Sequence, residues 1–108
     1  MIGGRPDDMA SIYGLSDTWR LPDGAVLHAH RLGDETAVYV AGSGNTHIVD
    51  NVTATILQRL RTGPASTLSL YQYVAGAFQQ PDEHANRHRV NTALVAAERM
   101  DLVQRTRQ

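Results

Sequence analysis

Residues 27–60 decide the fold, and they read LHAHRLGDETAVYVAGSGNTHIVDNVTATILQRL. Apolar residues alternate weakly over 25–31 and again over 35–41, on either side of Gly33 and Asp34, which predicts a β-hairpin. Two glycines and Asn45 predict the next turn, and residues 46–49 predict a short third strand. Asp50 suits a helix N-cap because its carboxylate can accept a hydrogen bond from a first-turn N–H. The stretch therefore predicts a small antiparallel sheet that leads into a helix ending near Arg61.

Two more helices are predicted after this stretch. Ser66 would cap the first, and its apolar residues recur at helical spacing: Leu70, Tyr73, Val74, Ala77 and Phe78. Gly76 lies inside that helix, and we attribute it to close packing against a neighbour. Asp82 would cap the last helix, which runs to about Met100 with a core stripe at Val90, Ala93, Leu94 and Ala97. The predicted fold class is α+β and winged-helix-like, with a three-stranded antiparallel sheet followed by three helices.

Composition indicates one domain at residues 18–104, flanked by a loosely ordered segment at 1–17 and a frayed tail at 105–108. Trp19 opens the domain in a short strand, and we expect it to cover the core rather than to bind a base. The 108 residues carry a formal charge of −1, with ten arginines, no lysine and no cysteine. No apolar run approaches the ~20 residues of a membrane helix, and the first residues lack the apolar core of a signal peptide. We therefore expect a cytoplasmic protein.

Patterns that carry catalysis do not appear in the sequence. It has no P-loop lysine, no Gly-rich dinucleotide fingerprint and no serine in a G-x-S-x-G setting. His28 and His30 share one strand face, and His84 and His88 are four residues apart on a helix, but no H-E-x-x-H pattern accompanies them. We predict that these are surface histidines, that the protein is not an enzyme, and that it uses no metal or cofactor.

The order of the apolar segments resembles that of the PqqD family of small peptide chaperones. The nearest resemblance is to the short PqqD-like proteins of the HPr-rel-A system, which occur beside a protein related to HPr kinase; Trp19 matches a tryptophan that opens that subgroup. The resemblance spans about residues 18–104. It rests on these segments: residues 46–50, residues 56–60, the helix at Leu70, then Val90, Leu94, Ala97, Leu102 and Val103.

This resemblance implies a peptide-binding module of the kind called a RiPP recognition element. A peptide would add as a strand beside the third strand and pack against the third helix, and the module would present that peptide or a partner to an associated enzyme. An HPr-kinase-related protein is a candidate partner. The implied site consists of Thr46, His47, Ile48 and Val49 on the strand and of Arg87, Val90, Asn91 and Leu94 on the helix. Asp101 stands where the family has Gly or Asn and would adopt a left-handed conformation at some cost. Ala97 replaces a larger apolar residue, which leaves a shallower core or a wider groove as alternatives.

Two other functions compete with this interpretation. A winged-helix nucleic-acid binder would read its ligand with a recognition helix, and the hairpin near Arg31 and Gly33 would be the wing. The recognition helix of such a binder would present Arg87, His88, Arg89, Asn91 and Thr92. The formal charge of −1 makes nucleic-acid binding the weaker hypothesis. A metal-dependent enzyme that uses the histidines ranks third.

Overall fold

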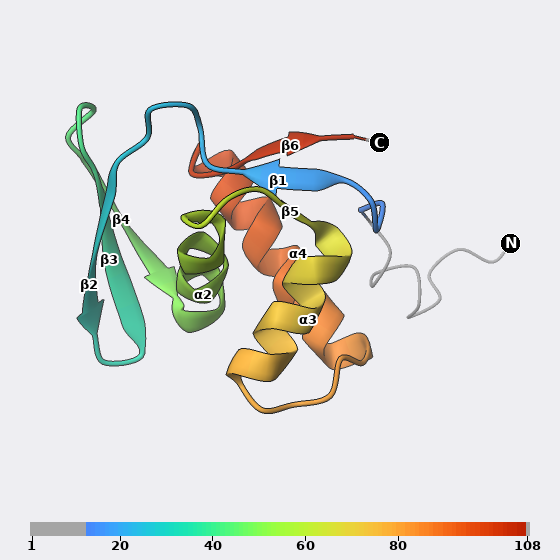
Figure 1. Cartoon of the computed structure of the whole chain (residues 1–108). Helices are drawn as coiled ribbons and strands as arrows, with labels where there is room; N and C mark the ends of the chain where they lie inside the picture. The colour runs from blue at the N-terminus through green and yellow to red at the C-terminus, as the bar shows by residue number, and fades with distance from the viewer. Residues whose placement is uncertain (1–12, 108) are drawn as a thin grey trace, which may run out of the picture.

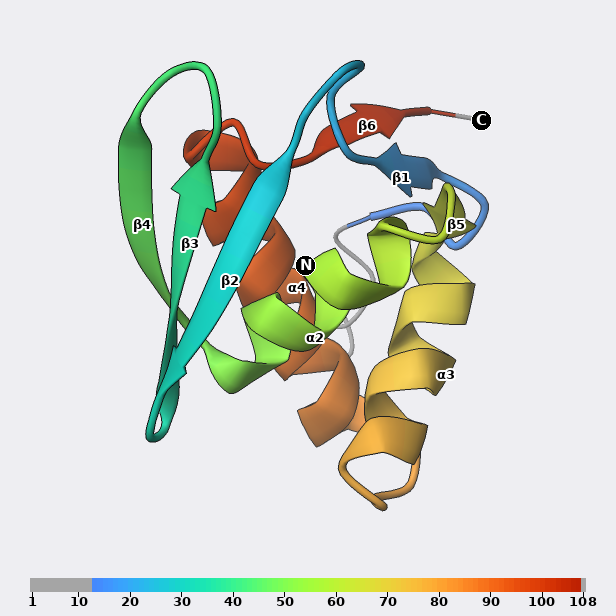
Figure 2. The ribbon, with the colours of Figure 1, turned by 60° about the vertical axis from the view of Figure 1, so that its left-hand side comes forward.

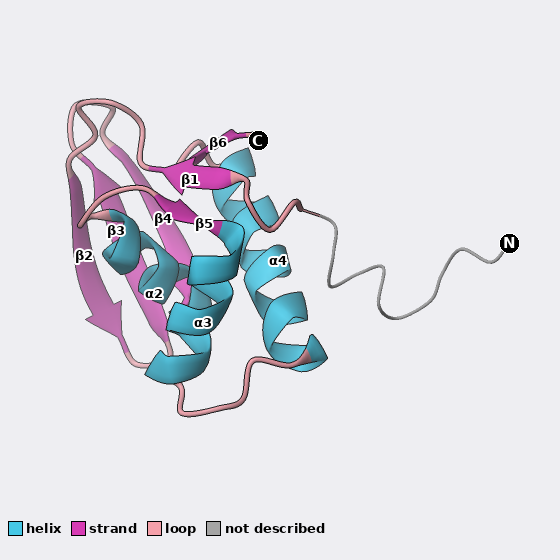
Figure 3. Ribbon diagram, turned by 45° about the vertical axis from the view of Figure 1, so that its right-hand side comes forward, coloured by secondary structure: helices cyan, strands magenta, loops and turns pink. Residues whose placement is uncertain are grey.

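Three helices and two small antiparallel sheets make up the computed structural model, which describes residues 13–107 (Figure 1). The fold is therefore α+β, as predicted. Figure 3 shows the two sheets on different sides of the helices. The elements in chain order are β1 (Thr18–Arg20), β2 (Leu27–Leu32), β3 (Glu35–Val40), β4 (Asn45–Asp50), α2 (Asn51–Leu60), β5 (Ala65–Ser66), α3 (Thr67–Ala77), α4 (His84–Arg99) and β6 (Gln104–Thr106).

The larger sheet has the order β2-β3-β4, and it contains the predicted hairpin and third strand. Ala29 pairs with Val38, and Val38 pairs with His47, so these side chains share the inner face that α2 covers. Ala37 pairs with Ile48 on the opposite, outer face. Figure 2 shows β4 at one edge of this sheet and β2 at the other, with α2 drawn on the β2 side. The turn before β4 needs its glycines, because Gly42 and Gly44 have φ angles of 97° and 78°.

The second sheet, β5-β1-β6, joins the two ends of the domain and was not predicted. Trp19 pairs with Ala65 on one side and with Arg105 on the other. Its indole is fully buried and donates a hydrogen bond from Nε1 to Thr67 Oγ1 at 2.9 Å, which confirms it as a core residue. The chain after residue 104 was expected to fray, but it forms β6 because β1 offers it backbone partners. This long-range pairing leaves no local sequence signal.

Within residues 13–17, part of the segment expected to be loose, Tyr13 and Asp17 are buried and the three residues between them are exposed. Tyr13 is buried, and its ring meets that of Trp19 edge-on at 4.8 Å between centroids. The Arg105 guanidinium lies 4.8 Å from the centre of the Tyr13 ring and 3.7 Å from the Asp17 carboxylate. Residues 1–12 and residue 108 lie outside the described part of the chain, so the expectations for them stay untested.

The helix caps agree with the sequence at two of three positions. Asp50 Oδ1 accepts from the Thr53 N–H at 2.8 Å, and Ser66 Oγ accepts from the Ser69 N–H at 3.0 Å. The predicted cap at Asp82 is wrong, because Glu83 is the N-cap of α4 and makes no side-chain cap bond. The Asp82 carboxylate binds side chains of the first turn of α4 instead.

The buried stripe of α3 differs from the predicted one. Tyr71 is fully buried, whereas Tyr73 and Phe78 are 39% and 38% exposed. The expectation that Gly76 packs closely is also wrong, since a Cβ built there would meet nothing within 4 Å. The predicted stripe had the right period but was rotated around the helix, because α4 packs on the side that carries Thr67, Leu70, Tyr71, Val74 and Ala75.

The end of α4 closes as expected. Asp101 has a φ of 58°, and its N–H donates to Glu98 O while the Leu102 N–H donates to Ala97 O, which is a Schellman motif. Leu102 and Val103 then turn back into the core. Ala97 is buried there too. In residues 13–107, no helix has the length and apolar character needed to cross a bilayer.

Candidate functional site

Strand β4 offers an unpaired backbone edge. Its register joins it to β3 along all six residues, and no other described strand pairs with it. In an antiparallel pair every second residue bonds to the neighbouring strand, so the alternate residues of β4 direct N–H and C=O groups outward. An exposed row of this kind is a template for an added strand. This edge contains all four strand residues implied by the family resemblance.

The side chains of β4 divide between the two faces of the sheet. Thr46 and Ile48 lie on the outer face, where Ile48 is 52% exposed. His47 and Val49 lie on the inner face, where His47 is partly buried and Val49 belongs to the core. A strand added beside β4 would therefore have one row of side chains next to Ile48 and the other directed toward the helices.

The four helix residues implied by the family resemblance do not form a free surface beside β4. Val90 and Leu94 are fully buried in the core. Asn91 is buried as well and accepts a hydrogen bond from the Tyr71 hydroxyl at 2.7 Å. The Arg87 guanidinium lies 4.9 Å from the centre of the Tyr71 ring. Arg87 and Asn91 are one helical turn apart, so the flank of α4 that carries them faces α3.

Arg87 is also held by an acidic partner. Its Nη2 donates to Asp82 Oδ2 at 2.9 Å and its Nε donates to Asp82 Oδ1 at 3.3 Å. These hydrogen bonds raise the pKa of Arg87, and burial raises the pKa of Tyr71. Asn86 donates from Nδ2 to Tyr71 O and to Asp82 Oδ1, both at 2.9 Å. This cluster fastens α4 to α3 and buries Asn91, whereas the Arg87 side chain stays 29% exposed.

The C-terminal end of α4 lies near β4. A hollow of about 420 Å³ opens there, between the β3–β4 turn, the connection from β1 to β2, and the α4 terminus. Asn45 and His47 line it from β4, and Met100 and Asp101 line it from the turn that follows α4. Met100 was not among the predicted site residues, because those taken from the family resemblance lie on the central stripe of the helix. The available sequence signal was Asp101, because a left-handed residue after Met100 marks where α4 ends.

The histidines do not gather into a metal site. Within residues 13–107, no group of three or more His, Cys, Asp or Glu side chains is placed to hold an ion. The rings of His84 and His88 stack with centroids 6.4 Å apart, and His28 lies 6.2 Å from the Tyr39 ring. The hypothesis of a metal-dependent enzyme gains no geometric support from these pairs.

Comparison with known proteins yields one structural neighbour of direct interest. No protein-family model matches the chain, and no curated protein matches it in sequence. The chain shares its fold with TbiB1, solved in complex with the TbiA(beta) leader peptide. The two align with a TM-score of 0.58 and 15% sequence identity, over 79% of this chain and 94% of TbiB1. At this identity the likeness shows the fold alone.

Proposed function

We propose that this protein is a non-enzymatic peptide-binding module that receives an extended peptide along β4 and presents it to an associated enzyme. The observation that carries the proposal is the six-residue strand β4, which pairs with β3 and with no other strand of residues 13–107. Main-chain hydrogen bonds along such an edge supply affinity, and the pockets for alternate side chains supply specificity. The shared fold with TbiB1, a protein that binds a leader peptide, supports the same assignment.

The contact residues follow from the geometry of β4. Outer-face side chains of the peptide would pack beside Thr46 and Ile48, and inner-face side chains would enter the hollow between His47 and Met100. This site would be supported by buried residues of the core beneath it, which are Val49, Val90, Asn91 and Leu94. Arg87 keeps its role in joining α4 to α3. The enzyme served by the module is proposed to be a protein related to HPr kinase, which co-purification of the two full chains would test.

Alternate backbone methylation tests strand addition directly. A peptide would first be selected from a random twelve-residue library on the full chain, then remade with single N-methyl groups at successive positions. We expect methylation at every second residue to abolish binding, because those N–H groups would pair with β4, and methylation at the others to be tolerated. Loss without this alternation would contradict strand addition.

A matched pair of variants locates the peptide on the sheet. Ile48 and Leu32 both lie on the outer face, are 52% and 51% exposed, and occupy opposite edges. We expect Ile48→Ala to weaken the selected peptide about fivefold, through lost apolar contact, and Leu32→Ala to leave binding unchanged. Calorimetric titration measures both. Equal effects of the two variants would place the peptide elsewhere.

Duplex DNA serves as the negative ligand. With Arg87 and Asn91 engaged by α3 and Asp82, we expect no salt-dependent binding to duplex DNA at low ionic strength. Fluorescence anisotropy with a labelled duplex checks this, and tight salt-dependent binding would favour the nucleic-acid alternative.

A further inference from the structure

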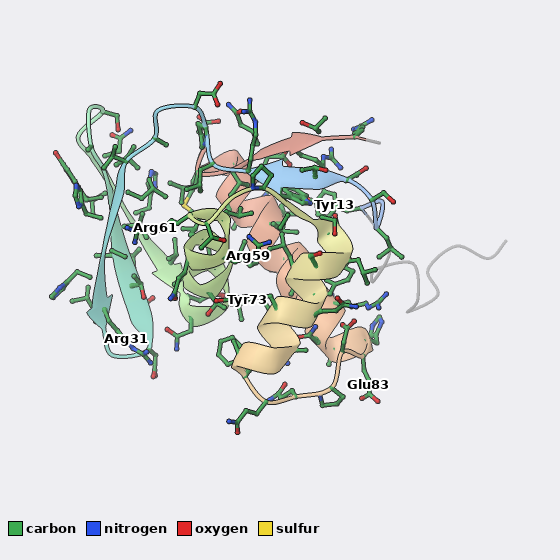
Figure 4. All side chains as sticks on the ribbon, in the orientation of Figure 1. Tyr13, Arg31, Arg59, Arg61, Tyr73 and Glu83 are labelled. Carbon is green, nitrogen blue, oxygen red and sulfur yellow. The ribbon has the colours of Figure 1, made fainter. Side chains whose placement is uncertain are left out.

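A second groove lies on the side of the larger sheet away from β4. It has a volume of about 440 Å³ and runs between the inner face of β2 and β3, helix α2 and the end of α3. Because β2 and β4 are the two edges of the sheet, a ligand in this groove would not compete with one on β4. Figure 4 shows Arg31 on the sheet and Arg61 at the end of α2, and both line the groove.

The groove carries positive charge without a counter-charge. Its lining includes Arg31 and Arg61 but no aspartate or glutamate. The ion pairs of the described chain engage Arg20, Arg87 and Arg105 instead. Arg31 donates from Nε to Gly33 O at 3.1 Å, which orients its guanidinium and leaves the two terminal nitrogens for another acceptor. Two unneutralised guanidinium groups on one groove, in a chain of net charge −1, favour a carboxylate-bearing ligand.

The floor of the same groove is apolar. Leu27, Val38 and Leu57 form it from the core, and Phe78 stands at its rim, 38% exposed. Phe78 is held there because α3 ends in a Schellman motif, in which the Gln80 N–H donates to Ala75 O at 2.9 Å and the Gln79 N–H to Gly76 O at 3.2 Å. An apolar floor between two cations suits a ligand that alternates carboxylates with apolar side chains.

We infer that this groove binds an acidic, amphipathic peptide segment of a partner protein. The segment would place carboxylates against Arg31 and Arg61 and an apolar side chain against Phe78. A peptide is favoured over a small amphipathic acid because the groove runs beside β2, whose outer backbone groups pair with no other described strand. A main chain has donors and acceptors for that edge, and an acyl chain has none.

The test uses the uniformly ¹⁵N-labelled full chain and two synthetic hexapeptides with blocked ends. One peptide alternates Glu with Leu and ends in Phe, and the control replaces each Glu by Gln. We expect the acidic peptide to shift the amide signals of Ala29, Thr55 and Phe78, to bind about tenfold more tightly than the control, and to weaken as salt is raised. Signals that move only outside the groove would overturn the inference.

Single charge variants distinguish a site from general attraction. We expect Arg31→Gln and Arg61→Gln each to weaken the acidic peptide about fivefold or more. Arg99→Gln, an exposed position on α4, removes the same charge and should leave its affinity unchanged. Equal weakening by all three variants would overturn the inference. Binding of decanoate in the groove without binding of the acidic peptide would overturn it in favour of a small acid.

The library-selected peptide separates this inference from the proposed function. We expect it to bind the Arg31→Gln and Arg61→Gln variants as it binds the unaltered chain, because it occupies β4. The two proposals can therefore be refuted separately. Absence of binding at β4 would leave binding of the acidic peptide in the groove unaffected, and absence of binding in the groove would leave binding at β4 unaffected. Loss of both ligands from either arginine variant would show that the groove and the edge form one site and would overturn the inference.

Discussion

Asp101 is a single residue that carries backbone strain. It has a φ of 58° at the end of α4, a conformation that costs a residue with a Cβ roughly 1–2 kcal/mol. The conformation persists because the turn satisfies two backbone carbonyls of the helix and directs Leu102 into the core. Asp101 thus lines the hollow beside β4 in a conformation that glycine would adopt without strain.

Replacing Asp101 with glycine should therefore stabilise the protein. We expect Asp101→Gly to raise the free energy of unfolding by about 1 kcal/mol, and Asp101→Asn to raise it by less, because asparagine tolerates this conformation only partly. Urea denaturation with an unchanged m value measures the effect. A loss of stability in the glycine variant would mean that the aspartate side chain itself stabilises the turn.

Tyr71 contributes both a buried hydrogen bond and a pH dependence. We expect Tyr71→Phe to lower the free energy of unfolding by about 1 kcal/mol, through loss of the bond to Asn91, and Tyr73→Phe to change it little.

Burial raises the pKa of Tyr71 in the folded state. The folded state then holds the proton above pH ~10 while the unfolded state releases it, so stability falls as pH rises through this range. Tyr71→Phe should flatten that fall, which denaturation at pH 8 to 11 would measure.

Helix α3 shows how packing chooses among similar apolar stripes. Its sequence contains two overlapping sets at helical spacing, one with Tyr73 and Phe78 and one with Tyr71 and Ala75. When the second set faces inward, the Tyr71 hydroxyl donates a hydrogen bond to Asn91 on α4, which favours that set. Phe78 then lies at the rim of the groove that Arg31 and Arg61 line.

Gly76 is exposed in α3 and has no packing role, so alanine should be preferred there. We expect Gly76→Ala to raise the free energy of unfolding by about 1 kcal/mol through helix propensity. Gly33→Ala is the contrasting change, because Gly33 has a φ of 68°, and it should destabilise the hairpin. Thermal denaturation followed by circular dichroism compares the two. Destabilisation by Gly76→Ala would reveal a contact at that position.

The whole molecule is closed by β6, which brings the C-terminal segment beside β1. Arg105 covers the rings of Tyr13 and Trp19, with its guanidinium carbon 5.7 Å from the centre of the Trp19 ring. Near one end of the described chain Tyr13 belongs to the core, and near the other the partly buried Arg105 packs against it. The domain is one unit that extends beyond residue 104.

Arg105 should accordingly matter more than its neighbour. We expect Arg105→Ala to cost about 1 kcal/mol of stability, because it loses two cation–π contacts and the pairing with Asp17. Arg107→Ala, at an exposed position, is the control and should be nearly neutral. Trp19 fluorescence during denaturation reports on both variants. Equal stabilities would contradict a structural role for β6.

The sequence alone identified the fold class, the hairpin, the third strand and the caps at Asp50 and Ser66. These features depend on contacts between residues a few positions apart, or on a two-residue alternation that is visible in the chain. It also led attention to residues 46–49, whose position at a sheet edge the structure shows and whose peptide binding stays a prediction.

Only the tertiary structure decided which sides of the helices face inward and what lies beside β4. Arg87 and Asn91 turn toward Tyr71 rather than toward the strand, and Met100 stands near His47 instead. The pairing of β6 with β1 and the groove between Arg31 and Arg61 were equally invisible in the sequence. Each joins segments far apart along the chain. Local spacing can predict that a helix has an apolar side, but the partner that packs against it determines which side is used.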